Sequence, residues 1–348
     1  MTRILILSLG DDGFAAELAA AGERLAPGAF VHEPCDPLGG TPSDLTYEHL
    51  TLGGIDLETL ESVFVYGLAY QDPVLPAAAD NLDWGLWQSR YVLEQQGFSH
   101  LYSLLSELAA RGVAVFNPVE ALIANYAKPA LFGAAAKARL KVPDWLCGND
   151  PEEARAFAER HDLVLWRPAT GRAAWQVFRA KQRRALIGTE RPPVLLAEAR
   201  EGTIVRAFCL DGRVLLTLAL EAPDTAEIER LERFLVADRP YPENAAARIM
   251  KATAARFSVV LATLDPGGPG ARGAPCLYDV EAAPLLGGLP PEIRDFLAER
   301  LALGLLGRFD EATAPPGLGP DASERESLFL RRMLRIQFDI EATKHREE

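Results

Sequence analysis

The stretch LLAEAREGTIVRAFCLDGRVL, residues 195–215, carries the clearest structural signals in this sequence. Two apolar runs, at 194–198 and 203–210, are typical of buried strands. The second run passes through Asp211-Gly212 into a third at 213–220, and an Asp-Gly pair between apolar runs is a strong signal for a tight hairpin turn. Arg206 interrupts an otherwise apolar strand and needs a partner if it is buried, whereas Glu198 is either an exposed edge residue or a functional group.

Toward the N-terminus the pattern changes to alternating strands and helices. We predict strands at 4–9, 60–66 and 113–116 and helices at 14–25 and 86–111, the longer helix being interrupted near Gly97. This alternation is typical of a small domain with a parallel sheet. The opening residues MTRILILSLGDDG fit a first strand better than a signal peptide.

The middle and the end of the chain contain further elements. Residues 119–140 have a helical pattern, and residues 163–166 form a strand that ends at Arg167. Later elements are helices at 225–234, 244–255, 291–306 and 323–343 and strands at 259–265 and 276–281. A proline-rich linker, 309–322, precedes the last helix, which we expect either to pack on its own domain or to form a homodimer contact.

Composition narrows the class of protein. The chain has 348 residues, 49% of them hydrophobic, which is enough for two or three packed units. Its formal net charge of -13 argues against a nucleic-acid partner, because such binding depends on Lys and Arg at phosphates. The four cysteines form no CxxC pair, and no apolar run approaches the roughly 20 residues that span a bilayer. We therefore expect a cytoplasmic protein without a membrane partner.

Several charged residues follow one another in an order that suits a bound triphosphate. Cations must meet the phosphates, and carboxylates must hold a divalent metal between the phosphate oxygens. Each residue also has an ordinary structural interpretation: a solvated lysine, an arginine paired with a structural carboxylate, or an aspartate in a turn. The candidates are Lys128, Arg167, Glu198, Arg206, Asp265, Asp279 and Glu281.

The order of these segments resembles the ATP-grasp superfamily, and within it the RimK-like and peptide-maturase (graspetide-type) ligases. The likeness covers roughly residues 115–305, and it depends on five segments in the same order rather than on one decisive motif. The segments are NPVEALIANYAKPALFGAAAKARLKVPDW (117–145), LVLWRPATG (163–171), LLAEAREGTIVRAFCLDGRVL (195–215), FSVVLATLD (257–265) and CLYDVEAAP (276–284).

The resemblance implies a role for each candidate. Lys128 and Arg167 would bind ATP phosphates, and Glu198 would lie at the hinge whose backbone contacts adenine. Arg206 would face the transferred phosphoryl group as the catalytic residue. The metal ligands for Mg²⁺ would be Asp265 and Glu281.

This sequence also departs from the family pattern. Arg167 stands where the family usually has Lys, Thr263 replaces a Gly, and Ala283 stands two residues after Glu281, where the family has Asn. Asp279 lies two residues before Glu281 and therefore on the same face of a strand, so we expect it to supply the missing metal ligand.

Together these observations predict an α/β fold. A small parallel-sheet domain of the pre-ATP-grasp type (1–117) would precede a two-lobed α+β ATP-grasp fold. The two lobes would be a lid (118–193) and a C-terminal lobe (194–308), followed by a linker and C-terminal helix (309–348).

The implied activity is ATP- and Mg²⁺-dependent ligation of a carboxylate to an amine, hydroxyl or thiol through an acyl phosphate. The substrate would be an amino acid or a peptide. The alternative is a catalytically degenerate protein of this fold that binds nucleotide in a regulatory or accessory role.

Overall fold

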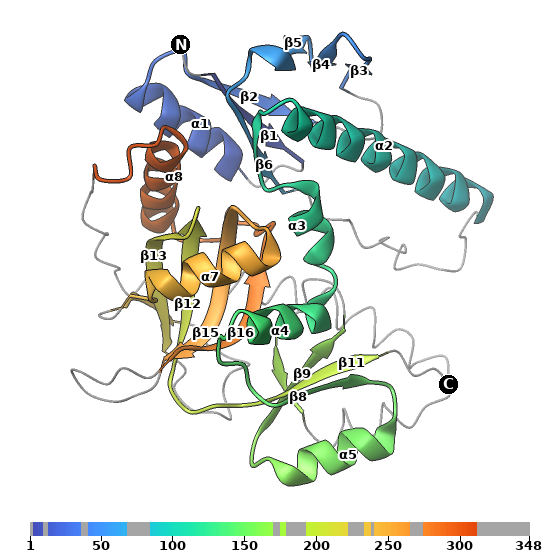
Figure 1. The fold of residues 1–348 in the computed structure, drawn as a ribbon, viewed down its shortest axis with the longest axis vertical. Helices are drawn as coiled ribbons and strands as arrows, with labels where there is room; N and C mark the ends of the chain where they lie inside the picture. The colour runs from blue at the N-terminus through green and yellow to red at the C-terminus, as the bar shows by residue number, and fades with distance from the viewer. Residues whose placement is uncertain are drawn as a thin grey trace. The chain divides into compact units, whose positions relative to one another are not determined.

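The computed structural model describes residues 3–9, 13–35, 41–67, 84–169, 175–178, 193–221, 233–237, 240–264 and 274–311 (Figure 1). The chain forms two compact units. The first contains residues 1–119 together with 283–348, and the second contains residues 120–282. The expected linker and C-terminal helix lie outside the described residues, apart from 309–311.

The first unit is built on a parallel sheet in the order β2-β1-β6-β7. The central strands β1 and β6 are buried along their whole length, because helices flank the sheet and leave these strands no solvated face. This confirms the predicted strand and helix alternation. The strands are β1 (Ile4–Ser8), β2 (Phe30–Pro34), β6 (Ser62–Tyr66) and β7 (Ala114–Phe116).

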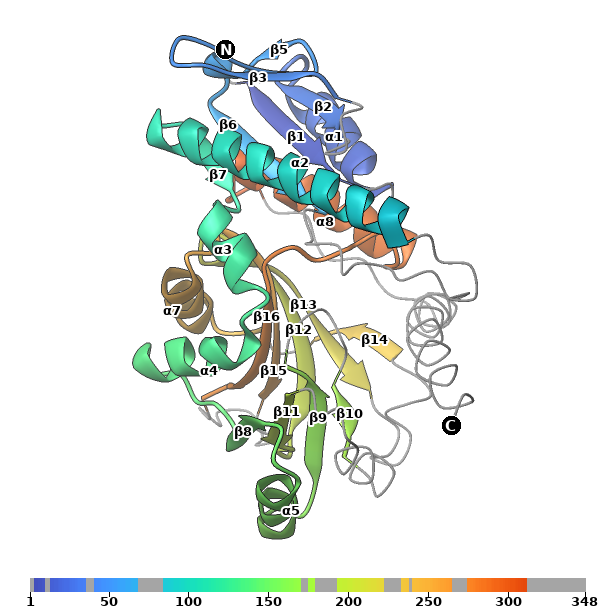
Figure 2. The same ribbon diagram turned by 90° about the vertical axis from the view of Figure 1, so that its right-hand side faces the viewer.

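Three helices complete this unit: α1 (Phe14–Leu25), α2 (Trp84–Ala110) and α8 (Pro291–Leu305). Helices α1 and α8 pack against each other (Figure 2). Arg294 on α8 forms an ion pair with Glu17 on α1 at 2.8 Å. Helix α8, which we expected in the C-terminal lobe, therefore belongs to the same compact unit as the N-terminal sheet. Helix α2 continues through Gly97 without the expected interruption.

A short antiparallel meander in this unit was not predicted. Its strands have only two or three residues, too few to give an alternating pattern in the sequence. The elements are β3 (Ser43–Leu45), β4 (Leu50–Leu52), β5 (Ile55–Asp56) and the 3₁₀ turn η1 (Leu57–Thr59).

The second unit contains a four-stranded sheet in the order β10-β9-β11-β8, which we call the lid sheet. Helix α5 (Pro151–Arg160) covers one face of it, where Phe157 packs with Val164 and Leu196. Asp150 caps this helix by accepting a hydrogen bond from the Glu152 backbone at 2.8 Å, as the Asp-Pro-Glu-Glu start predicts. The strands are β8 (Trp145–Gly148), β9 (Val164–Pro168), β10 (Gln176–Val177) and β11 (Val194–Glu198).

The other sheet of this unit is antiparallel, in the order β14-β13-β12-β15-β16. The predicted Asp-Gly hairpin joins its strands β12 and β13, and both turn residues have the positive φ of a type I′ turn, 47° at Asp211 and 81° at Gly212. Strand β14 includes Phe234, where we expected a helix; the rest of that expected helix, 225–232, lies outside the described residues. The strands are β12 (Thr203–Leu210), β13 (Arg213–Glu221), β14 (Arg233–Val236), β15 (Phe257–Leu264) and β16 (Cys276–Glu281).

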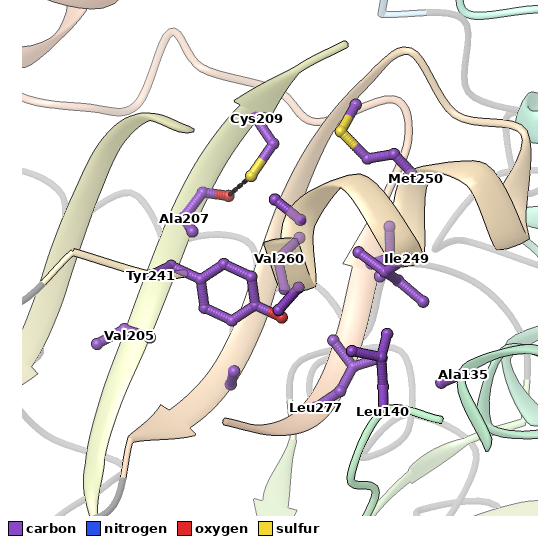
Figure 3. Packing of buried hydrophobic residues seen from close by; sticks show 14 of the residues in the cluster. Ala135, Leu140, Val205, Ala207, Cys209, Tyr241, Ile249, Met250, Val260 and Leu277 are labelled. Atoms are coloured by element: carbon purple, nitrogen blue, oxygen red, sulfur yellow. Dashed lines mark hydrogen bonds between the residues drawn. The ribbon is translucent and has the colours of Figure 1, made fainter. Parts of the chain in front are cut away.

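The core of the second unit lies between this five-stranded sheet and two helices, α4 (Lys128–Lys137) and α7 (Glu243–Thr253). Figure 3 shows Ile249 of α7 and Ala135 of α4 facing Val260 and Leu277 of the sheet. Helix α3 (Val119–Ala124) precedes α4, and three residues separate the two helices within the predicted helical stretch. No helix in the described part of the chain is long and apolar enough to cross a membrane.

Candidate functional site

The first residue of α4 is Lys128, a buried cation. Pro129 follows it in the first turn, where a proline fits because no intrahelical partner awaits its missing N–H. The Lys128 side chain is only 2% exposed, and its Nζ lies 2.8 Å from Asp279 Oδ1 and 3.5 Å from Glu281 Oε2. It also donates to the Val280 carbonyl at 3.0 Å. Lys128 is therefore held by β16 and is not a solvated lysine.

The second cation comes from the lid sheet. Arg167 on β9 pairs in register with Leu195 on β11, and its side chain leaves the sheet on the face opposite α5. It is 2% exposed, donates to Asp279 Oδ2, and lies with its guanidinium carbon 5.5 Å from the centre of the Trp175 ring. A guanidinium over an aromatic face gains a cation–π contact, which a lysine amine reproduces less well.

A bulge in β16 brings the acidic side chains to these cations. Asp279 pairs with Leu261 and Leu277 pairs with Ala262, so Tyr278 has no partner residue on β15. The alternation of faces is thereby broken: Leu277 and Val280 enter the core under α7, whereas Tyr278 and Asp279 both point to the opposite face. Glu281 follows on that face, as its spacing from Asp279 predicts.

The Asp279 carboxylate is stabilised by the two cations. Burial raises the pKa of Asp279, but the charges and hydrogen bonds of Lys128 and Arg167 outweigh this effect and lower the pKa to about 2. The carboxylate also accepts a hydrogen bond from the Val280 backbone at 2.8 Å. Asp279 is therefore ionised at neutral pH, and together with Glu281 it balances the two positive charges.

Asn125 completes the cluster, and sequence reasoning gave it no role. Its amide nitrogen donates to Glu281 Oε1 at 2.6 Å, and its oxygen accepts from Lys128 Nζ and from the Ala282 backbone, each at 3.1 Å. The spacing was visible in the sequence, because Asn125 precedes Lys128 by only three residues and the two side chains can therefore reach the same site. We call Asn125, Lys128, Arg167, Asp279 and Glu281 the charged cluster.

Arg206 lies on the sheet face that carries the charged cluster. It pairs with Leu261 across β12 and β15, and Leu261 pairs with Asp279 across β15 and β16. Directly paired residues share a face, and two strand spacings amount to roughly 10 Å. Asp265, the other expected metal ligand, lies outside the described residues.

Glu198 ends β11 at the expected hinge and contacts a different residue of β16. The Tyr278 hydroxyl donates to the Glu198 carbonyl at 2.8 Å and accepts from the Arg200 backbone N–H at 2.7 Å. The Glu198 carboxylate itself lies 2.9 Å from the Arg200 guanidinium. Burial raises the pKa of the Tyr278 hydroxyl well above its ordinary value, so this group remains a proton donor.

Two other features of the lid sheet lie apart from the charged cluster. Asp144, His161 and Glu198 place one ligand atom each within 4.8 Å of one another, but the Arg200 guanidinium already neutralises Glu198. A hollow of about 230 Å³ lies beside α5 and includes Leu146 and Leu196, which face the side of the sheet opposite Arg167. Neither feature involves the charged cluster.

The charged cluster thus joins residues from three separate segments, and comparison with known proteins tests whether the fold that does this is familiar. No protein-family model and no curated protein matches the sequence. Among solved structures, the ATP-grasp ligase PsnB complexed with minimal precursor, Mg and ADP matches with a TM-score of 0.68 and 19% identity, over 88% of this chain and 98% of that one. The chain has the ATP-grasp fold.

Two further solved structures match to a similar extent. Macrocyclase MdnC bound with precursor peptide MdnA from Microcystis aeruginosa MRC gives a TM-score of 0.66 at 14% identity, over 88% of this chain and 99% of that one. A Chryseobacterium gregarium RiPP-associated ATP-grasp ligase in complex with ADP and a leader and core peptide gives 0.66 at 14%, over 91% and 99%. The expected α/β fold, including the resemblance to peptide-modifying ATP-grasp ligases, is confirmed at the level of structure.

Proposed function

We propose that this protein is an ATP-dependent ligase that joins a carboxylate to an amine, hydroxyl or thiol through an acyl phosphate. The observation that carries the proposal is the charged cluster, in which two cations that are each 2% exposed meet two carboxylates on one face of an ATP-grasp fold. Burying so many charges is costly unless they are paired. A triphosphate with its metal would pair with both kinds of charge, because the phosphates bind the cations and the metal binds the carboxylates.

The donor set fits a magnesium ion. Carboxylate oxygens are the ligands that Mg²⁺ prefers, and Asp279 and Glu281 offer them side by side. When bound, the ion would neutralise charge that develops on the phosphate oxygens. Asp279 and Glu281 also have the spacing of the family's Glu and Asn, whereas Ala283 lies beyond the end of β16. We therefore propose Asp279 and Glu281 as metal ligands on β16, in which case Glu281 takes the place of the family's Asn and the departure at Ala283 does not argue against catalysis.

The cations would exchange partners when nucleotide binds. Lys128 and Arg167 now contact Asp279. In the proposed complex the two cations would bind the phosphates, and Asp279 and Glu281 would hold the metal. Arg206, on the same sheet face, would stabilise the transferred phosphoryl group. A substrate carboxylate oxygen attacks the γ-phosphorus and ADP leaves. The nucleophile then attacks the acyl carbon, phosphate leaves, and the proton of the nucleophile passes to solvent.

We propose a peptide as the carboxylate substrate. The solved structures of PsnB, MdnC and the Chryseobacterium gregarium ligase each hold a precursor, precursor peptide, or leader and core peptide, and the present chain matches nearly their whole length. Side-chain carboxylates of Asp or Glu would be the groups activated.

One observation favours the accessory role as a second candidate. Asp279 already contacts both cations and Glu281 supplies the second negative charge, so the charges of the cluster balance without nucleotide. A protein in which this pairing persists would bind nucleotide without turnover, or would bind none.

The test measures Mg²⁺-dependent ADP release by the full chain with ATP and a pool of peptides that carry Asp or Glu together with Lys, Ser or Thr. We expect ADP release that requires peptide, with peptide products lighter by one water. Asp279→Asn and Glu281→Gln should each lower the rate by at least about a hundredfold, since loss of even outer-shell metal partners costs 10- to 100-fold.

The matched control is Asp211→Asn, which makes the same chemical change in the hairpin turn, outside the charged cluster. Asp211 forms an ion pair with Arg256, and Asn tolerates the left-handed backbone of this position. The control should keep wild-type rates. Nucleotide binding without ADP release under any of these conditions would establish the accessory role instead. Absence of nucleotide binding would overturn both candidates.

A further inference from the structure

One tyrosine occupies two backbone groups that face the same way. The Glu198 carbonyl and the Arg200 N–H are two residues apart on extended chain, so they point to the same side. The Tyr278 hydroxyl bonds to both, at 2.8 and 2.7 Å, and Tyr278 is only 4% exposed. These two groups form a small edge that can pair with any donor lying next to an acceptor.

The bulge in β16 is the reason that the hydroxyl reaches this edge. In a regular strand Tyr278 would alternate with Asp279 and enter the opposite face, under α7. The bulge turns Tyr278 into the cluster of Ala197, Leu165 and Trp175 on the lid sheet instead. Consecutive residues of one strand thus serve two ends of the same site: Tyr278 at the hinge and Asp279 at the cations.

The chemistry of that edge matches adenine. The N1 atom of adenine accepts a hydrogen bond and the adjacent N6 amino group donates one, which is the pattern that the Tyr278 hydroxyl presents to Arg200 and Glu198. Guanine offers a donor at N1 and an acceptor at O6, the reverse order. Tyr278 and an adenine ring would therefore compete for the same two backbone groups, whereas guanine is mismatched there.

We infer that Tyr278 gates the base end of the nucleotide site: its hydroxyl occupies the Glu198 carbonyl and the Arg200 N–H in the free protein and releases them to adenine. This inference rests on the proposed nucleotide-binding function and adds a specificity-determining residue to it. The free protein keeps both backbone groups satisfied, and a base is admitted only if it replaces both hydrogen bonds. Binding of ATP is weakened by that competition, and binding of GTP is weakened further.

The experiment compares nucleotide affinities of the wild type and Tyr278→Phe by calorimetry, using ADP and GDP with Mg²⁺. Phe keeps the ring and removes the competing hydroxyl, so ADP should bind about tenfold more tightly, a change of 1.4 kcal/mol. GDP affinity should change much less, because the exposed edge still mismatches guanine. Tyr241→Phe is the matched control, since Tyr241 is 2% exposed in the core of the same unit and lies away from the hinge.

Hydrogen exchange at the Arg200 amide gives a second measurement. In Tyr278→Phe this amide should exchange faster than in the wild type without nucleotide, and ADP should restore its protection. Tyr278→Leu repeats the test with a different side-chain shape if the Phe variant fails to fold.

Each outcome decides the inference. Equal ADP affinity in the wild type and both Tyr278 variants, or equal tightening for ADP and GDP, would overturn the gate while leaving nucleotide binding established. If neither the wild type nor any variant binds nucleotide, the proposed function falls, and the gate falls with it.

Discussion

Replacing Asp279 by Asn should destabilise the second unit strongly, because it removes one negative charge from between two buried cations. The side chain keeps its shape and size, so packing is preserved. Lys128 and Arg167 lose the charge that each now contacts, and each of them is only 2% exposed to solvent.

The size of the effect follows from the electrostatics of the cluster. A carboxyl that ionises at about 2 instead of 3.8 contributes roughly 2 kcal/mol at neutral pH, since one pKa unit corresponds to about 1.4 kcal/mol. Breaking a buried ion pair and leaving its partner charged typically costs about 3–5 kcal/mol. We therefore expect Asp279→Asn to lower the free energy of unfolding by about 2–5 kcal/mol.

Urea unfolding followed by tryptophan fluorescence measures this loss, because Trp145, Trp166 and Trp175 all lie in the second unit. The midpoint should fall while the slope stays unchanged. Asp211→Asn breaks an ion pair whose partners are 34% and 36% exposed, so it should cost at most about 1 kcal/mol. Equal losses in the two variants would refute the electrostatic account of the cluster.

The same cluster makes a prediction about pH. The folded pKa of Asp279 is lowered, so its contribution is complete above the ordinary value of 3.8 and is lost as the pH falls through about 2. Wild-type stability should therefore drop between these two pH values by more than that of Asp279→Asn. Parallel profiles for the two proteins would contradict the assigned pKa.

Further predictions concern two glycines, Arg167 and the cysteines. Gly202→Ala should lower the free energy of unfolding in urea by about 1–3 kcal/mol, because Gly202 has a φ of 139° and an added Cβ would lie 2.3 Å from the Leu264 carbonyl. Gly133→Ala should instead raise it by about 0.5–1 kcal/mol, because Gly133 lies within helix α4 with open space around it. Arg167→Lys should keep ADP release within about tenfold of the wild type while losing about 1 kcal/mol of stability from the Trp175 contact, and complete loss of activity would show that the guanidinium geometry is essential. A thiol reagent should label Cys35 and Cys147 in the native protein before the buried Cys209 and Cys276, since burial raises the Cys209 pKa; peptide mass mapping would detect the reverse order.

Much of the fold was predictable because many of its strands are continuous apolar runs bounded by turn-forming residues. The bounds of β11, β12 and β16 were predicted to the residue, and the Asp211-Gly212 turn followed from the need for positive φ. Strands of two or three residues carry no period, so β3, β4, β5 and β10 were not found, whereas the equally short β7 was predicted from the apolar run at 113–116. The packing of α8 against α1 could not be predicted either, because an apolar helix face does not specify which distant helix it packs against.

Four of the five residues of the charged cluster were expected to lie close together, but Asn125 and the pairings were not predicted. Lys128, Arg167, Asp279 and Glu281 lie together as expected, yet the sequence did not show that the cations contact the carboxylates directly. Tyr278 was missed because a regular strand would turn it away from Asp279. The bulge that reverses this is set by the mismatch in register between β15 and β16, which no local pattern reveals.

The division of the chain into units has a consequence for biosynthesis. Residues 120–282 form one uninterrupted unit, whereas the other unit needs both 1–119 and the segment from 283 onward. On the ribosome the later, continuous unit has its whole sequence available first, while the early sheet must wait for α8 to emerge before α1 gains its partner. The face of α1 that packs against α8 therefore stays uncovered until α8 has been synthesised.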